Sequence, residues 1–429
     1  MPEDQHSHDN LRDHNRGQRG IRRSSGFILG GLSGGHGVFH WFTQSFLVML
    51  PEVRETFGLA AVQVGAIATT REVVAGGVAL PGGVATDLLR RYWGLVLAAC
   101  MAVFGAGWLI MGSSPTYYWL LAGMGLVAMA AAVWHLPAVA ALSQYFAHRR
   151  GTALSFHGAG GNIGDVAGPA LTGILLSILV WQRILQIYAV IPLFLAFLVL
   201  WGFRDLGRMG AQDKPSLKTQ LAQTRRVLKH PVIWGITLVG GLRAMAYVSF
   251  MTFLPLYLAD QEGLSALWRG IYVALLQLVG IFASPLMGYL SDKLGRKAVL
   301  MPGLVLLTVL SLAVPFGSGI ALIIIIAVMG TFLFSDQPIL TAAALDLVGD
   351  GVAATTLGVL SFSRFILSAL SPIIGGVLYQ LQPEVTFYYV GGLFGLAVAL
   401  LMIVPMSKVS KGPGEPTGLG APAAQERRA

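Results

Sequence analysis

The sequence predicts an all-α membrane protein built from two related six-helix bundles. Three observations predict this class: an unusually apolar composition, twelve apolar runs of membrane-spanning length, and an internal repeat. Of the 429 residues, 55% are hydrophobic and 11% are charged, and the mean hydropathy is +0.69. Because about 25% of the residues in an average soluble protein are charged, this composition indicates an integral membrane protein.

Each of the twelve runs is long enough to be a membrane span, since a helix needs roughly 20 residues to cross a hydrocarbon core. We place the runs at 27–50, 64–88, 93–112, 118–146, 152–179, 184–203, 232–258, 268–290, 299–316, 320–347, 355–378 and 385–404. The first run follows a charged stretch, but it has no small-residue cleavage site near its end. We therefore expect a first span there and not a removed signal peptide.

Basic residues predict the orientation in the membrane. Most of the 29 Lys and Arg fall in the two tails and the central polar stretch, whereas Arg54, Arg183 and Arg269 fall on the other side. Both termini are therefore expected in the cytoplasm, and the membrane is expected to be a bacterial inner membrane. This asymmetry also explains the net charge of +9, so we expect no nucleic-acid partner.

The expected organisation has five parts: a cytoplasmic tail (1–26), a first bundle (27–203), a cytoplasmic linker (204–231), a second bundle (232–406) and a disordered cytoplasmic tail (407–429). Leucines recur at helical spacing among the basic residues of the linker. The linker is thus either a helix lying on the anionic inner leaflet or a solvated tether.

Four segments of the first half recur in the second half, in the same order and at a nearly constant offset. GGVATDLLRR matches GYLSDKLGRK, which sets Asp87 opposite Asp292. WHLPAVAAL matches SDQPILTAAAL more loosely, which sets His135 opposite Asp336. Because both copies begin on the same side of the membrane, the repeat axis is expected to lie along the membrane normal.

The segment GYLSDKLGRK, between the eighth and ninth runs, resembles the signature loop of the major facilitator superfamily. With the twelve runs and the linker, the resemblance covers nearly the whole chain and implies a transporter and not an enzyme. In that family the loop controls conformation: glycine lets two helices approach, and a carboxylate lies near arginines at a helix end. The corresponding residues are Gly83, Asp87, Arg91, Gly288, Asp292, Gly295 and Arg296.

A second resemblance concerns the subfamily. Gly35-His36 and the segment RRGTALSFHGAGGNIGDVAGP (149–169) are similar to the fosmidomycin-resistance group of bacterial exporters, which export a phosphonate. Glycines at four-residue spacing in this segment also predict a smooth face for close helix packing. The ending GPALTG resembles a motif of proton-coupled drug exporters, which favours efflux.

The family resemblance implies that the first, fourth, seventh and tenth helices line a central cavity. Polar residues gather on these helices and their neighbours, as expected if they avoid lipid. The expected substrate-binding residues are His36, His40, Gln44, His135, Arg243, Tyr247, Gln337 and Arg364. The expected proton-coupling carboxylates are Glu72, Asp165 and Asp336.

His36 and His40 lie one helical turn apart, which is compatible with metal binding, proton transfer or a structural role. HGVFH lacks the glutamate of an HExxH zinc protease, and no acidic third ligand follows nearby. We therefore expect no metal site and no cofactor. The two imidazoles are then either ligands for substrate or protons, or structural groups bonded to neighbouring carbonyls.

Three arginines in the spans are balanced by three carboxylates. The residues are Arg71, Arg243, Arg364, Glu72, Asp165 and Asp336. Arginine keeps its charge whereas a buried carboxylate can take up a proton. We therefore expect Arg243, with Arg364, to hold an anionic group, and Asp165 or Asp336 to carry the coupling proton. Alternatively, Arg364 pairs with Glu72 as a gate.

The expected function is proton-coupled transport of a small organic anion by alternating access, carried out by a monomer in a lipid bilayer. Efflux by proton antiport is favoured over a symporter that imports a carboxylate. A membrane-embedded enzyme or receptor would need a nucleophile, metal or phosphate-binding pattern, or an appended domain. The sequence has no GxSxG or zinc spacing, and its tails are too short for such a domain.

Overall fold

The computed structural model describes residues 21–207, 225, 229, 231–348 and 353–406, and these are predominantly helical. The first half contains α2 (Ser25–Phe57), α3 (Ala61–Leu88), α4 (Trp93–Gly112), α5 (Tyr117–Tyr145), α6 (Arg150–Leu175) and α7 (Trp181–Gly202). The second half contains α9 (Pro231–Asp260), α10 (Ala266–Leu294), α11 (Arg296–Ala313), α12 (Gly319–Leu333), α13 (Asp336–Val348), α14 (Ala353–Ala369), α15 (Ser371–Leu381) and α16 (Pro383–Ile403). The two tails and the linker fall largely outside the described residues, as does the expected linker helix.

Nine helical segments of the described chain are long and apolar enough to cross a membrane. The other three expected spans are α2, α3 and α6, which have the length of a span but lower apolarity. These three helices carry about half of the polar side chains of the site described below. Their lower hydropathy is therefore a consequence of the residues that they bring to the interior.

The tenth expected span is broken in its middle, because α12 ends at Leu333 and α13 begins at Asp336. A helix end leaves carbonyl groups without helical partners, and Arg243 of α9 donates from Nη2 to Leu333 O at 2.6 Å. Pro338 lies in the first turn of α13, where its missing N–H breaks no helical bond. The eleventh span is broken similarly, with Pro372 in the first turn of α15.

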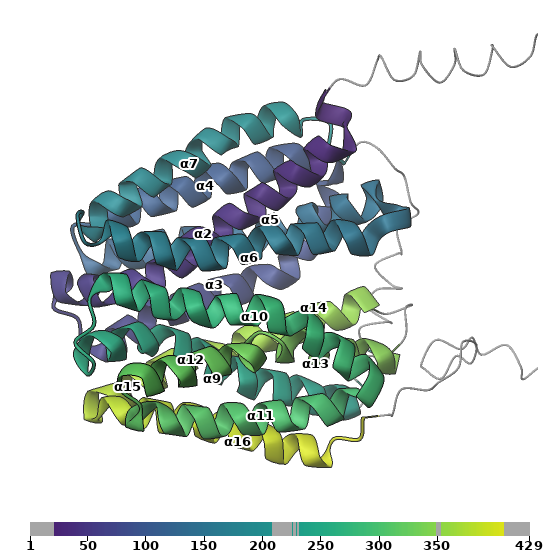
Figure 1. Ribbon diagram of the computed structural model, residues 1–429. Helices are drawn as coiled ribbons and strands as arrows, with labels where there is room; N and C mark the ends of the chain where they lie inside the picture. The colour runs from purple at the N-terminus through teal and green to yellow at the C-terminus, as the bar shows by residue number, and fades with distance from the viewer. Residues whose placement is uncertain (1–20, 208–224, 226–228, 230, 349–352, 407–429) are drawn as a thin grey trace, which may run out of the picture.

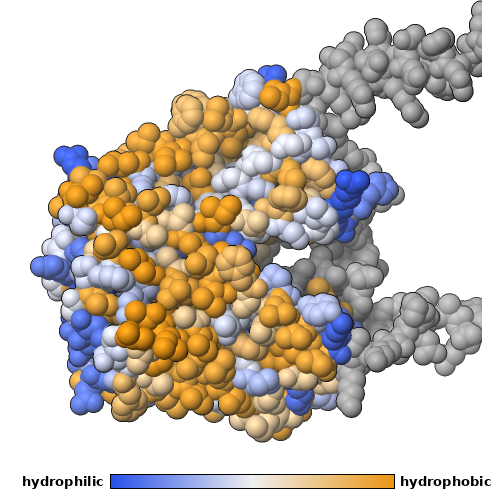
Figure 2. Space-filling model, in the orientation of Figure 1, coloured by the Kyte–Doolittle hydropathy of each residue, from blue (hydrophilic) through white to orange (hydrophobic). Residues whose placement is uncertain are grey.

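The two halves are stacked bundles, with the first half above the second in Figure 1. The described chain starts and ends on one side, here called the terminal side. On the opposite side, Glu52 pairs with Arg269 and Arg54 pairs with Asp260, so that α2 is joined to α10 and α9. Figure 2 shows a hollow between the halves on the terminal side. The molecule is thus closed on the opposite side and open on the terminal side.

Backbones of the two halves touch where α3 meets α15. A Cβ atom built on Gly65 would lie 2.1 Å from Pro372 O, closer than real Cβ atoms approach a backbone atom. Four residues further along α3, the Thr69 hydroxyl donates to Ala369 O at 2.6 Å. Glycine at position 65 is therefore required for this contact between the halves.

Within the first half, α6 packs closely on α2. Cβ atoms built on Gly160 and Gly164 would each lie 2.2 Å from a backbone oxygen of α2, and one on Gly168 would lie 2.4 Å from another. The predicted glycine packing face is confirmed. The adjacent face of α6 is thereby held against the polar face of α2.

Candidate functional site

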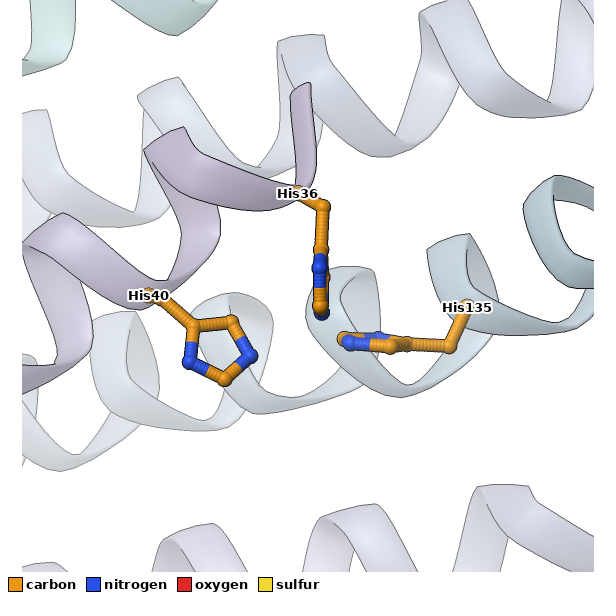
Figure 3. Close-up of side chains that lie close together, drawn as sticks. All are labelled: His36, His40 and His135. Carbon is orange, nitrogen blue, oxygen red and sulfur yellow. The ribbon is translucent and has the colours of Figure 1, made fainter. Parts of the chain in front are cut away.

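A cluster of imidazoles lies where α2, α5 and α6 meet. His36 and His40 come from one face of α2 and His135 from α5, and Figure 3 shows their rings turned toward a common point. The ring centroid of His36 lies 4.4 Å from that of His40 and 4.8 Å from that of His135. Three residues that were separately expected to bind substrate are therefore brought together.

Residues of α6 complete this cluster. His157 stacks on His36, with ring centroids 4.1 Å apart and planes 7° apart. A Cβ atom built on Gly161 would lie 2.8 Å from His36 Cε1 and 3.3 Å from His40 Cδ2. Glycine at 161 thus makes room for both imidazoles of α2.

Backbone carbonyls fix the tautomers of two imidazoles. His36 Nδ1 lies 2.8 Å from His157 O, and His135 Nδ1 lies 2.7 Å from Ala131 O. Because a carbonyl oxygen only accepts, the hydrogen of each neutral ring is on Nδ1 and the lone pair is on Nε2. The interpretation in which His36 bonds to a neighbouring carbonyl therefore agrees with the geometry.

His40 has a different partner, since its Nδ1 lies 2.8 Å from Asp165 Oδ1. The two side chains are 34% and 13% exposed, so this pair is less buried than Arg243 and Asp336, at 4% and 0%. Asp165, one of the expected proton carriers, is therefore engaged with an imidazole and not with an arginine.

A buried ion pair lies in the second half. Arg243 Nε donates to Asp336 Oδ2 at 2.7 Å, and the side chains are 4% and 0% exposed. Asp336 Oδ1 also accepts from the Gln337 backbone N–H at 2.7 Å. Arg243 lies over the ring of Tyr247, 5.1 Å from its centroid. Arg243 is thus bonded both to the helix break and to Asp336.

Glu72 is bonded to Arg71 and Ser368 in this structure, and its suggested gating role with Arg364 stays a prediction. Its Oε1 lies 3.1 Å from Arg71 Nη1, and its Oε2 accepts from the Ser368 hydroxyl at 2.7 Å. No ion pair joins it to Arg364 among the described residues. The pairing of Glu72 with its sequence neighbour leaves Arg364 to other contacts.

Arg364 lies over the ring of Phe365, 4.4 Å from the centroid. Within the described chain, no carboxylate oxygen lies within 4.0 Å of its guanidinium nitrogens. It lines a small pocket with Gln337 and Thr237, whose Oε1 and Oγ1 atoms are buried and have no hydrogen-bond partner among the described residues. The structure therefore brings together two expected substrate-binding residues, Gln337 and Arg364, among unsatisfied polar atoms.

A larger cavity lies between the halves. Gln44 of α2, Arg71 of α3 and Tyr247 of α9 supply polar atoms to a lining that is otherwise mostly apolar. The side chain of Arg71 is 43% exposed. Sequence reasoning recognised the charge of Arg71 but gave it no role in the site. Its position on the second span could have indicated this role, because the family resemblance sets that span beside the cavity.

The second copy of the signature loop lies at the junction of α10 and α11. Asp292 pairs with Arg296, whose Nε also donates to Asp346 Oδ2 of α13 at 2.9 Å. Gly295 has φ +103°, a conformation that favours glycine. The predicted role of Gly288 in close helix approach is wrong, because a Cβ atom built there meets no atom within 4 Å.

The first copy is described only in part. Nothing is described of the surroundings of Gly83 or of the Asp87 side chain, so the predicted role of these two residues stays a prediction. Arg91 is exposed, and its guanidinium donates to the Tyr92 hydroxyl.

A family model described as "Major Facilitator Superfamily" matches residues 32–372 and 281–427 of the chain. The chain belongs to the major facilitator superfamily. This membership confirms the expected all-α fold with two six-helix bundles. It also confirms that the protein is a membrane transporter of a small molecule and not an enzyme.

Relatives in the superfamily have various names. An uncharacterised MFS-type transporter of Bacillus subtilis, YfnC, is 24% identical over 80% of this chain and 85% of its own length. A nitrite extrusion protein of Bacillus subtilis is 25% identical over 52% of this chain and 54% of its own. A fosmidomycin resistance protein of Escherichia coli is 22% identical over 69% of this chain and 72% of its own, in agreement with the subfamily resemblance.

The fold is also similar to a solved structure of the superfamily. A bacterial homologue of the human lysosomal transporter Spinster, in an inward-facing and occupied conformation, superposes with a TM-score of 0.76 at 16% identity. The superposition covers 89% of this chain and 97% of the other. At this identity the likeness concerns the fold alone.

Proposed function

We propose that this transporter moves a small organic anion, which binds in the cavity lined by Gln44, Arg71 and Tyr247. The observation that carries this proposal is a guanidinium that faces this cavity: Arg71 lines it, and the Arg71 side chain is 43% exposed although Nη1 is bonded to Glu72. An anion in the cavity would accept charge-assisted hydrogen bonds from this guanidinium.

We propose export as the direction, from a bacterial inner membrane and by a monomer. The names of two relatives, a nitrite extrusion protein and a fosmidomycin resistance protein, support export. With both termini placed in the cytoplasm by the charge asymmetry, the hollow on the terminal side opens to the cytoplasm. An exporter would collect its substrate there, and rocking of the halves would release it on the other side.

Asp336 is the carboxylate that we propose for proton coupling. It is fully buried and is the charge partner of Arg243, so gain or loss of its proton changes a buried ion pair of the second half. Asp165 is instead bonded to His40, and its partner is an imidazole and not a guanidinium.

A second candidate is proton symport that imports a carboxylate, which the Arg243–Asp336 pair favours. An anion that replaced Asp336 on Arg243 would leave a buried carboxylate without its counter-ion unless the carboxylate took up a proton. Proton and anion would then bind together, and by linkage each would favour the other. Antiport instead requires that the two compete.

Transport by purified protein in liposomes with an imposed pH gradient distinguishes the two candidates. In the proposed exporter, a preloaded anion leaves as protons enter, whereas in the symporter an external anion enters with them. Asp336→Asn is expected to abolish the pH-driven flux but to keep anion-for-anion exchange, and Glu55→Gln, an exposed carboxylate, is the matched control. Normal pH-driven flux in Asp336→Asn would contradict the coupling role.

Replacement of Arg71 tests the anion site. A hydrogen bond to a charged group contributes about 1.5–3 kcal/mol, so Arg71→Gln should raise the KM for the anion by roughly 10- to 150-fold. Arg71→Lys keeps a cation beside Glu72 but loses the bidentate geometry, so we expect an intermediate KM. Arg183→Gln, at an exposed position, is the control. An unchanged KM in Arg71→Gln would place the anion elsewhere.

A further inference from the structure

We propose that His36, His40 and His135 bind a divalent transition-metal ion through their Nε2 atoms. One ring nitrogen from each residue lies within 4.8 Å of those from the other two. In Figure 3 the three rings converge from two helices. The expectation of no metal site rested on spacing within the first span, and it did not foresee that α5 supplies the third nitrogen.

The hydrogen bonds of the cluster select Nε2 as the ligand atom. Nδ1 of His36 and Nδ1 of His135 donate to backbone carbonyls, and Nδ1 of His40 is bonded to the Asp165 carboxylate. Each ring therefore has a lone pair on Nε2, where no protein hydrogen bond is found in the described part of the chain. Metal-binding histidines have this arrangement, in which the second nitrogen is held by a carbonyl or carboxylate.

Ring nitrogens of three neutral imidazoles gather within 4.8 Å of one another, and a positive ion among them would be attracted by the Nε2 lone pairs. His157 holds His36 in place, because it is 4% exposed and its ring stacks on that of His36. The His40 side chain is 34% exposed, so the cluster is not sealed inside the protein.

The donor set defines the class of ion. Imidazole nitrogen suits Zn²⁺, Co²⁺, Ni²⁺ and Cu²⁺, whereas Mg²⁺ and Ca²⁺ prefer oxygen. Tetrahedral Zn²⁺ with N–metal bonds of about 2.0–2.1 Å needs nitrogens about 3.3 Å apart, so nitrogens that lie up to 4.8 Å apart would have to approach by about 1.5 Å. Three protein ligands also leave a coordination position for water or another small ligand.

Binding of Co²⁺ to the detergent-purified full chain tests the proposal, with visible absorption and equilibrium dialysis as readouts. His6, His8 and His14 are first changed to Ala, because tail histidines also bind metals. We expect one tightly bound ion per chain in this background, with the intense visible bands of tetrahedral Co²⁺. This assay measures no transport, so its result is independent of the proposed function.

Variants assign the ion to the cluster. His36→Ala and His135→Asn should each lower Co²⁺ affinity by at least about 100-fold, and Asp165→Asn, which keeps all three ligands, by about 10- to 100-fold. His148→Ala, at an exposed position outside the cluster, should bind normally. If a ligand variant is not monodisperse, zinc-dependent protection of the background protein against thermal unfolding is the second measurement. Absence of tight binding in the background protein, or unchanged binding in His135→Asn, would overturn the proposal.

Discussion

Replacing Asp336 by Ala is expected to lower the free energy of unfolding by about 3–5 kcal/mol, the range found when one partner of a buried ion pair is removed. Arg243 would remain 4% exposed without its counter-ion, and its bond to Leu333 O cannot replace a negative charge. Thermal unfolding in detergent, followed by tryptophan fluorescence, measures the loss.

Two further variants make this result specific. Removing both charges, with Arg243→Leu and Asp336→Leu together, should restore most of the stability, because no unpaired charge is then buried. The recovery should be incomplete, since Leu333 O loses its donor, at about 1–3 kcal/mol. Asp346→Ala breaks an exposed pair with Arg296 and should cost about 1 kcal/mol or less. Equal losses in Asp336→Ala and Asp346→Ala would contradict the importance of burial.

Gly65→Val is expected to shift the protein away from the state that is closed on the opposite side. A Cβ atom at this position would lie 2.1 Å from Pro372 O, so α3 and α15 would have to separate. Overpacking of this kind costs about 1–3 kcal/mol, which corresponds to a roughly 5- to 150-fold change in the ratio of the two states. Because α3 and α15 belong to different halves, rocking of the halves can relieve this clash. A clash within the core of one half could not be relieved in this way.

Distances between spin labels measure this shift. Labels at Glu55 and Gln261, which lie in different halves on the opposite side, should move apart in Gly65→Val. The buried Cys100 is first replaced by Ser so that the labels are specific. Gly77→Val, on the same helix, is the matched control because a Cβ atom there meets no atom within 4 Å. If a folded Gly65→Val protein gave the distances of the control, the contact would not hold the halves together.

The sequence predicts the membrane spans and the composition of the polar centre, but not how its groups are paired. Spans follow from a local property, the length of an apolar run. The convergence of His36 and His135 was anticipated in part, because the repeat set the first and fourth spans at the centre. Glu72 bonds to Arg71 and Ser368 and not to Arg364, and this choice of partners depends on side-chain geometry across helices that no local pattern records.

The broken span illustrates the same limit. The run 320–347 is apolar enough to predict one continuous helix. In the structure it is interrupted, and Arg243 on another helix satisfies the carbonyl group of Leu333 at the break. Pro338 gave a local hint, although a proline also occurs within the unbroken α5. A residue that was expected to bind substrate thus has a structural role that appears only in the folded molecule.

The low apolarity of α2, α3 and α6 has a consequence for biosynthesis. A nascent segment enters the lipid according to its own hydrophobicity, and polar residues near its middle oppose that step. When α2 leaves the ribosome, the groups that later satisfy its histidines have not yet been made, since they belong to α5 and α6. The first segment is therefore poorly suited to enter the bilayer alone, and strongly apolar neighbours such as α4 would have to retain it. The polar residues of α2, α3 and α6 thereby make membrane insertion a cooperative step for the whole first bundle.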